Sequence, residues 1–125
     1  MNEISKLIEE IKEGKLLSQS VFKDLRPDEI LDKRDSEPFD SKWVNCFKEI
    51  EKRLRNFPLT EEIENEINEL REISFKVTSE ATKQHEISSY VSDDFELISK
   101  AIYLRLNNNF ANEMLESYRE NNVPS

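Results

Sequence analysis

Cysteine and histidine each occur once in this chain of 125 residues, as Cys46 and His85. Together they could form the nucleophile and base of a covalent catalyst. Cys46, however, lies between Val44 and Phe47 in an amphipathic segment, and a buried cysteine usually behaves as a small apolar side chain. Zinc sites usually draw on several Cys and His ligands, and the Glu-x-x-His pattern of di-iron bundles does not occur. We therefore expect no metal, no cofactor and no enzymatic activity.

Carboxylates are the other groups that could perform acid–base chemistry, and the chain has 27 of them. Two adjacent pairs, Glu61–Glu62 and Asp93–Asp94, stand where helices are expected to begin. Acidic side chains are favoured there because they cap free N–H groups and face the positive end of the helix dipole. Capping therefore explains both pairs without a catalytic role.

The charge of the chain excludes several classes of partner. The formal net charge is −9, whereas binding to nucleic acid or anionic membranes depends on Lys and Arg. No apolar run approaches the roughly 20 residues of a membrane span, and the N-terminus lacks the basic and apolar regions of a signal peptide. We expect a cytoplasmic protein that binds neither nucleic acid nor membranes, as a monomer or weak dimer.

Charge is also spread unevenly along the chain. Residues 60–72 hold six glutamates against one arginine, whereas residues 40–57 hold five basic and three acidic residues. One interpretation is a solvated helix face with ion pairs between neighbouring helices. The other is a surface that captures a basic protein, because complementary charge speeds encounter and sets specificity.

A single glycine, Gly14, indicates how these residues are positioned. Dinucleotide-binding and phosphate-binding loops need several glycines, and tight hairpins favour them. Apolar residues recur every three or four positions instead, which predicts helices. The sequence predicts an all-α fold, an irregular antiparallel bundle of five or six helices in a single domain over residues 1–125.

Within this domain we expect short N-terminal helices in 1–31, a loop at 32–40 and the main helical core in 41–120. Long helices are expected at 41–57, 61–84 and 93–106, with Thr60 as one N-cap and Asp93, followed by Glu96, as another. Residues 85–92 are expected to form a connector, and residues 123–125 to fray. The predicted core consists of Trp43, Phe47, Ile50, Leu54, Ile67, Leu70, Val77, Phe95, Ile98 and Ile102.

The expected helix start Tyr90-Val91-Ser92-Asp93-Asp94-Phe95-Glu96-Leu97-Ile98, with the closing Met114-Leu115-Glu116-Ser117-Tyr118, resembles bacterial immunity proteins. Small size and acidity extend this resemblance over the whole chain. Such proteins neutralise polymorphic or contact-dependent-inhibition toxins, many of which are nucleases. The resemblance implies that the chain occludes a basic cleft on a cognate toxin. The residues we expect to face that partner are Glu61, Glu62, Glu64, Glu69, Tyr90, Asp93, Asp94 and Glu96.

A second function remains open on the same residues. A helical adaptor or regulatory subunit of a cytoplasmic complex would bind through an apolar groove instead of through carboxylates. The two functions differ in their response to salt, since screening weakens contacts between exposed charges.

Overall fold

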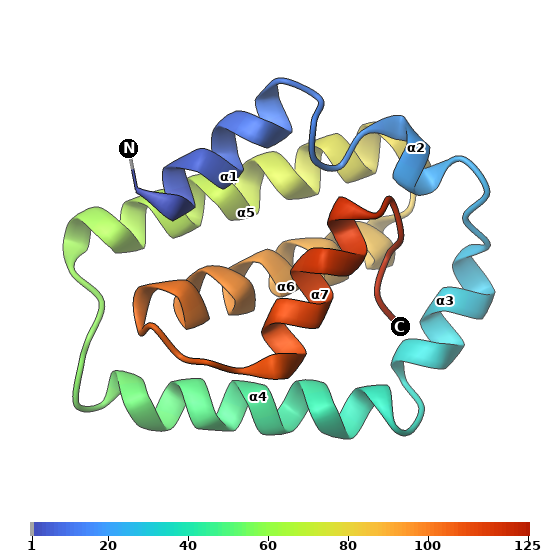
Figure 1. Cartoon of the computed structure of the whole chain (residues 1–125). Helices are drawn as coiled ribbons and strands as arrows, with labels where there is room; N and C mark the ends of the chain where they lie inside the picture. The colour runs from blue at the N-terminus through green and yellow to red at the C-terminus, as the bar shows by residue number, and fades with distance from the viewer. Residues whose placement is uncertain (1) are drawn as a thin grey trace.

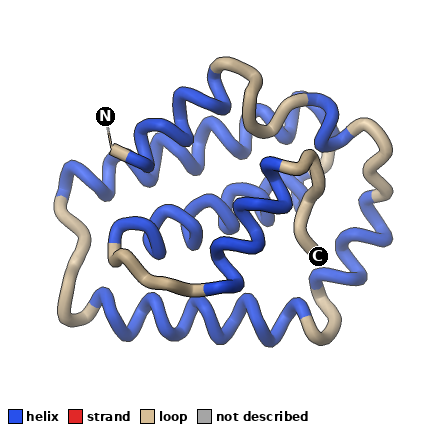
Figure 2. The backbone as a smooth tube through the Cα atoms, viewed as in Figure 1, coloured by secondary structure: helices blue, strands red, loops and turns tan. Residues whose placement is uncertain are grey.

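The computed structural model describes residues 2–125, which form seven helices and no strand (Figure 1 and Figure 2). The prediction of an all-α fold is confirmed, with seven helices in place of five or six because the short second and third helices are separate elements. Their bounds are α1 (Glu3–Lys12), α2 (Gln19–Phe22), α3 (Pro27–Arg34), α4 (Phe39–Leu54), α5 (Glu61–Thr82), α6 (His85–Tyr103) and α7 (Asn109–Arg119). Across residues 2–125, no helix combines the length and apolar composition needed to cross a bilayer.

Several helix ends follow the signals in the sequence. Thr60 caps α5 as predicted, because its hydroxyl accepts a hydrogen bond from the N–H of Ile63 at 3.2 Å. Gly14 has φ of +75° and follows the C-cap of α1. The N–H of Lys15 donates to the carbonyl of Glu10 at 2.9 Å, which is the long bond of a Schellman motif. Glycine adopts this left-handed conformation without steric strain, because it has no Cβ atom.

Two segments expected to be irregular are helical. The loop predicted at 32–40 shrinks to four residues, because α3 continues to Arg34 and α4 begins at Phe39. Acidic residues in the first turn of α3 and basic residues in its last turn match the helix dipole, so this charged stretch is a stable helix end. The connector predicted at 85–92 is the first part of α6, since Ile87 and Val91 continue the buried stripe of Phe95.

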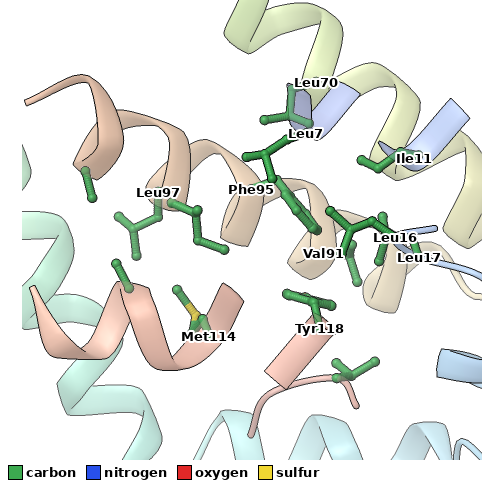
Figure 3. Packing of buried hydrophobic residues seen from close by; sticks show 14 of the residues in the cluster. Leu7, Ile11, Leu16, Leu17, Leu70, Val91, Phe95, Leu97, Met114 and Tyr118 are labelled. Atoms are coloured by element: carbon green, nitrogen blue, oxygen red, sulfur yellow. The ribbon is translucent and has the colours of Figure 1, made fainter. Parts of the chain in front are cut away.

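α6 is the central helix of the bundle. It packs against α1, α4, α5 and α7 and contributes ten buried residues. Figure 3 shows Val91 and Phe95 of α6 between Leu7 of α1 and Tyr118 of α7. The ring centroids of Phe95 and Tyr118 lie 4.9 Å apart. The carboxylates on α6 therefore sit on the helix against which α1, α4, α5 and α7 pack.

Small hydroxyl residues allow α5 and α6 to approach closely. Ser74 and Thr78 of α5 and Ser88 of α6 are fully buried. Each hydroxyl donates to a carbonyl of its own helix, for example from Thr78 to Ser74 at 2.7 Å, so no buried hydroxyl of the three lacks a partner. This interface fixes the orientation of α6 against the longest helix.

The predicted core is correct in part. Ile50, Ile67, Leu70, Phe95 and Ile98 are buried. Trp43, Leu54, Val77 and Ile102 are only partly buried, and Phe47 is exposed at 42%.

The core also takes in both ends of the chain. Residues of the N-terminal segment complete it, namely Ile4, Leu7, Ile8, Ile11, Leu16 and Leu17. The C-terminus does not fray as expected, since Val123 and Pro124 are buried.

Candidate functional site

Asp94 lies at the centre of a buried hydrogen-bond network that joins four helices. Both oxygens of its carboxylate accept from the guanidinium of Arg34, at 2.7 and 2.9 Å. The indole N–H of Trp43 donates to Oδ1 at 2.9 Å, and the hydroxyl of Tyr118 donates to Oδ2 at 2.6 Å. These four bonds occupy the approximately four lone-pair sites of the carboxylate. We call Arg34, Trp43, Asp94 and Tyr118 the Asp94 network.

Burial makes this network costly to disturb. The side chains of Arg34 and Asp94 are 4% and 0% exposed. Removing water from two charges is offset only when geometry is good and the remaining groups are bonded. Arg34 meets this condition with a two-point ion pair and a further bond to the carbonyl of Pro124 at 2.8 Å, although its Nε has no partner. Burial raises the pKa of Tyr118 well above its ordinary value, which keeps its hydroxyl protonated as a donor.

The Asp94 network holds aromatic side chains in place between α3, α4 and α6. The guanidinium of Arg34 lies 4.7 Å from the ring centroid of Phe39 and 4.9 Å from that of Tyr90. Trp43 is fixed by its bond to Asp94 and stacks on Phe47 with centroids 5.8 Å apart. The rings are thus positioned by buried charge and not by loops.

Aspartates border these rings. Asp35 and Asp40 are exposed, and Asp93 is half-buried beside them. The hydroxyl of Tyr90 donates to Asp35 at 2.8 Å. We call the surface made by these side chains the aromatic–acidic face. It consists of Asp35, Asp40, Trp43, Phe47, Tyr90 and Asp93.

Asp94 does not belong to any exposed surface, so its predicted place among the partner-facing residues is wrong. The error arises from the position of the helix start. Because α6 begins at His85, Asp93 and Asp94 lie in mid-helix, and Asp93 is not an N-cap. Successive residues of a helix point about 100° apart, so Asp94 faces the core while Asp93 faces outward.

Asp93 and Glu96 both bind Arg71 of α5, at 3.1 and 2.9 Å. Glu96 also pairs with Lys100 at 3.1 Å. Burial raises the pKa of Asp93 above its ordinary value, and the opposing charge of Arg71 offsets this only in part. Glu96 is therefore matched by two cations, whereas Asp93 is a carboxylate that its surroundings do not fully compensate.

The remaining predicted residues lie on α5. Glu61, Glu62, Glu64 and Glu69 are exposed, as expected from their positions off the apolar stripe. Glu69 forms an exposed pair with Lys12 at 3.4 Å. Figure 1 places the start of α5 at the opposite end of the molecule from α3 and the start of α4. The structure thus separates the predicted residues into two surfaces.

The sequence pattern did not reveal Asp35 and Asp40 as members of this face, nor the exposure of Phe47. The first two fell in a predicted loop, and Phe47 fell on a stripe that was assigned to the core. One signal was available, since the amphipathic Trp43 is a residue type that is rarely buried completely.

Cys46 and His85 lie on separate helices, Cys46 within α4 and His85 at the start of α6. Cys46 is 3% exposed, and burial raises its thiol pKa to about 11, so it stays protonated and unreactive. His85 begins α6, where its ring meets the edge of Phe75 at 5.5 Å. Within residues 2–125, no three His, Cys, Asp or Glu side chains are grouped as a metal site would require.

A groove of about 790 Å³ runs along α1, α6 and α7. Its lining includes the apolar side chains of Ile63, Ile102 and Leu115, together with Lys6 and Arg105. This is the surface that an adaptor binding through apolar contacts would use.

A helical bundle that presents preorganised aromatic rings among carboxylates has the features of a protein-binding module. The chain belongs to a family of immunity proteins, since the family model described as Immunity protein PIM1 matches residues 6–125. No curated protein matches the chain. The resemblance to immunity proteins is confirmed, and membership of the family implies that the protein binds a cognate toxin.

Proposed function

We propose that this immunity protein neutralises its toxin by covering a basic surface of the toxin with the aromatic–acidic face. The observation that carries the proposal is that Trp43 and Tyr90 line one cavity together with three aspartates. Phe47 stacks on Trp43, and the Asp94 network fixes Trp43 from the buried side. Tyr and Trp are enriched among residues that dominate binding energy. Rigid rings also lose little entropy when they bind. The protein acts by binding and needs no catalytic group.

The negative charge of the chain favours a toxin surface that is basic, such as the substrate cleft of a nuclease. A nuclease presents a basic cleft to the phosphates of its substrate. A protein of net charge −9 is attracted to such a cleft, and carboxylates can occupy the places of phosphates. We therefore propose a nuclease as the toxin and its substrate cleft as the surface that is covered.

Two matched charge reversals test which acidic surface binds. The first variant carries Asp35→Lys and Asp40→Lys in the aromatic–acidic face. The second carries Glu61→Lys and Glu62→Lys at the start of α5. All four residues are exposed, and each variant changes the net charge equally. Asp40 lies in the first turn of α4, and Glu61 and Glu62 lie in the first turn of α5. Both variants therefore place lysine at the positive end of a helix dipole, which makes them comparable in this respect.

The readout is survival of cells that express the cognate toxin together with each variant. The Asp35/Asp40 variant is expected to lose protection, whereas the Glu61/Glu62 variant keeps it. Circular dichroism of each purified variant establishes that it is folded. Protection by a folded Asp35/Asp40 variant would overturn the proposal. Loss of protection only in the Glu61/Glu62 variant would move the interface to the start of α5.

The apolar groove supports the alternative function as an adaptor. Binding through that groove would persist at high salt, because apolar contacts are not screened. If the toxin binds through the aromatic–acidic face, both its affinity and its association rate should instead fall as salt increases. A salt series on the toxin complex distinguishes the two.

A further inference from the structure

A small cavity opens in the aromatic–acidic face between α3, α4 and α6. Its volume is about 150 Å³, and the rings of Phe39, Trp43 and Tyr90 line it. That space equals about five water molecules at roughly 30 Å³ each. Pockets for small ligands usually span about 300–1,000 Å³. The cavity is therefore of a size for one side chain and too small for a nucleotide.

The charges around this cavity favour a cation. Asp35, Asp40 and Asp93 line it, and the only basic lining residue is Arg34. The guanidinium of Arg34 is already matched by both oxygens of Asp94, at 2.7 and 2.9 Å. Asp93 shares its partner Arg71 with Glu96, so the charge of Asp93 is incompletely balanced. An added positive charge would complete this balance.

We propose that the cavity binds one cationic side chain, a lysine or an arginine, of the toxin. The inference rests on the proposed function, which makes the toxin the partner of this face. The guanidinium of Arg34 already lies over the rings of Phe39 and Tyr90. Trp43 is therefore the lining ring that an incoming cation would contact. A cation gains energy from an aromatic face, and more when water is excluded. The three aspartates supply the ion pairs, and the Asp94 network fixes the rings before the side chain arrives.

Trp43 provides a direct optical report of occupancy, because it is the only tryptophan of the chain and lines the cavity. The probes are N-acetylarginine amide and N-acetyllysine amide, with N-acetylcitrulline amide as a neutral analogue of arginine. We expect the two cationic amides to change Trp43 fluorescence saturably, with a Kd on the order of 1–10 mM. The citrulline amide should leave the emission unchanged. A larger response to one cationic amide identifies the preferred side chain.

A matched pair of variants locates the binding. Asp40→Asn with Asp93→Asn should weaken binding of the cationic amides by about tenfold or more, since it removes two of three ion-pair partners. Glu61→Gln with Glu62→Gln removes the same charge far from the cavity and should leave the Kd unchanged. An equal response to citrulline amide, no saturation with either cationic amide, or unchanged affinity in the Asp40/Asp93 variant would overturn the proposal.

The amide titration needs no toxin, so its failure is distinct from failure of the proposed function. If the amides do not bind while the Asp35/Asp40 reversal still abolishes protection, the aromatic–acidic face binds the toxin but the cavity does not bind a cation. If the amides bind while that reversal leaves protection intact, the cavity binds a cation but not one from the toxin.

Discussion

Asp93 and Asp94 are neighbours on α6, and each pairs with an arginine, yet their surroundings differ completely. The Arg34–Asp94 pair is 4% and 0% exposed, and its closest contact is 2.7 Å. The Arg71–Asp93 pair is 40% and 43% exposed, with a contact of 3.1 Å. One step along a helix therefore separates a carboxylate that holds the fold together from one that is free to meet a partner.

The energetic consequences of breaking the two pairs should differ accordingly. Exposed ion pairs contribute about 0–1 kcal/mol, because water and salt screen them. Removing one partner of a buried pair costs about 3–5 kcal/mol, since the other charge stays buried without compensation. The comparison predicts that Asp94 is needed for stability and Asp93 for binding.

The largest expected effect is that of Asp94→Asn. The substitution keeps the shape of the side chain but leaves the charge of Arg34 unmatched, so the free energy of unfolding should fall by about 3–5 kcal/mol. Domains of this kind are stabilised by only about 5–15 kcal/mol. Urea denaturation followed by circular dichroism measures the loss. Asp93→Asn is the control, and equal effects of the two substitutions would break the comparison.

Tyr118→Phe should have an intermediate effect. It removes the donor at 2.6 Å from Asp94 without opening a cavity, and a buried acceptor that loses its partner costs about 1–3 kcal/mol. Tyr103→Phe removes a hydroxyl that donates to Pro58 at the exposed surface, and it should change stability by less than about 0.5 kcal/mol. A larger loss for Tyr103→Phe would contradict this ranking.

The raised pKa of Tyr118 also predicts how the stability of the fold changes at high pH. Its pKa is raised in the folded protein, so the fold retains a proton that the unfolded chain releases near its ordinary value of 10. Its contribution is fully present below that value and is lost as pH rises above it. Wild-type stability should therefore fall more steeply above pH 10 than that of Tyr118→Phe. Parallel curves would show that Tyr118 is not held protonated by the fold.

Asp93→Asn should have the smallest effect and an informative pH dependence. The pKa of Asp93 is raised above 3.8 by burial, so its charged form is less favourable in the fold than in the unfolded chain. Stability linked to Asp93 is present below 3.8 and lost as pH rises through the raised value. At neutral pH the variant should equal or slightly exceed the wild type, by up to about 0.5 kcal/mol. At lower pH the difference should vanish, which a urea series at several pH values measures.

Much of the fold could be predicted from local signals. The stripes at 41–57 and 61–84, the Thr60 cap and the Gly14 turn are properties of neighbouring residues, and the structure confirms them. The start of α6 could not be placed in this way. α5 ends at Thr82, and its C-cap Lys83 has the left-handed conformation (φ +58°), where neither glycine nor proline marks the turn.

The site depended on contacts that no local pattern contains. Asp94 is buried because Arg34, 60 positions earlier in the chain, provides a matching charge. Helical spacing alone could not reveal that pair, so Asp94 was grouped with its exposed neighbour. The other predicted partner-facing residues remain predictions, namely Glu61, Glu62, Glu64, Glu69, Tyr90, Asp93 and Glu96. The aromatic–acidic face contains Tyr90 and Asp93.

Oxidative footprinting of the toxin complex tests the central claim most directly. Hydroxyl radicals modify exposed aromatic side chains, and the chain carries two that are well exposed, Phe47 at 42% and Phe57 at 63%. Phe47 lies in the aromatic–acidic face, whereas Phe57 lies beyond the end of α4 and serves as an internal control. We predict that binding of the toxin protects Phe47 and the half-buried Tyr90 several-fold and leaves Phe57 unchanged. Unaltered oxidation of Phe47 and Tyr90 in a saturated complex would contradict the account.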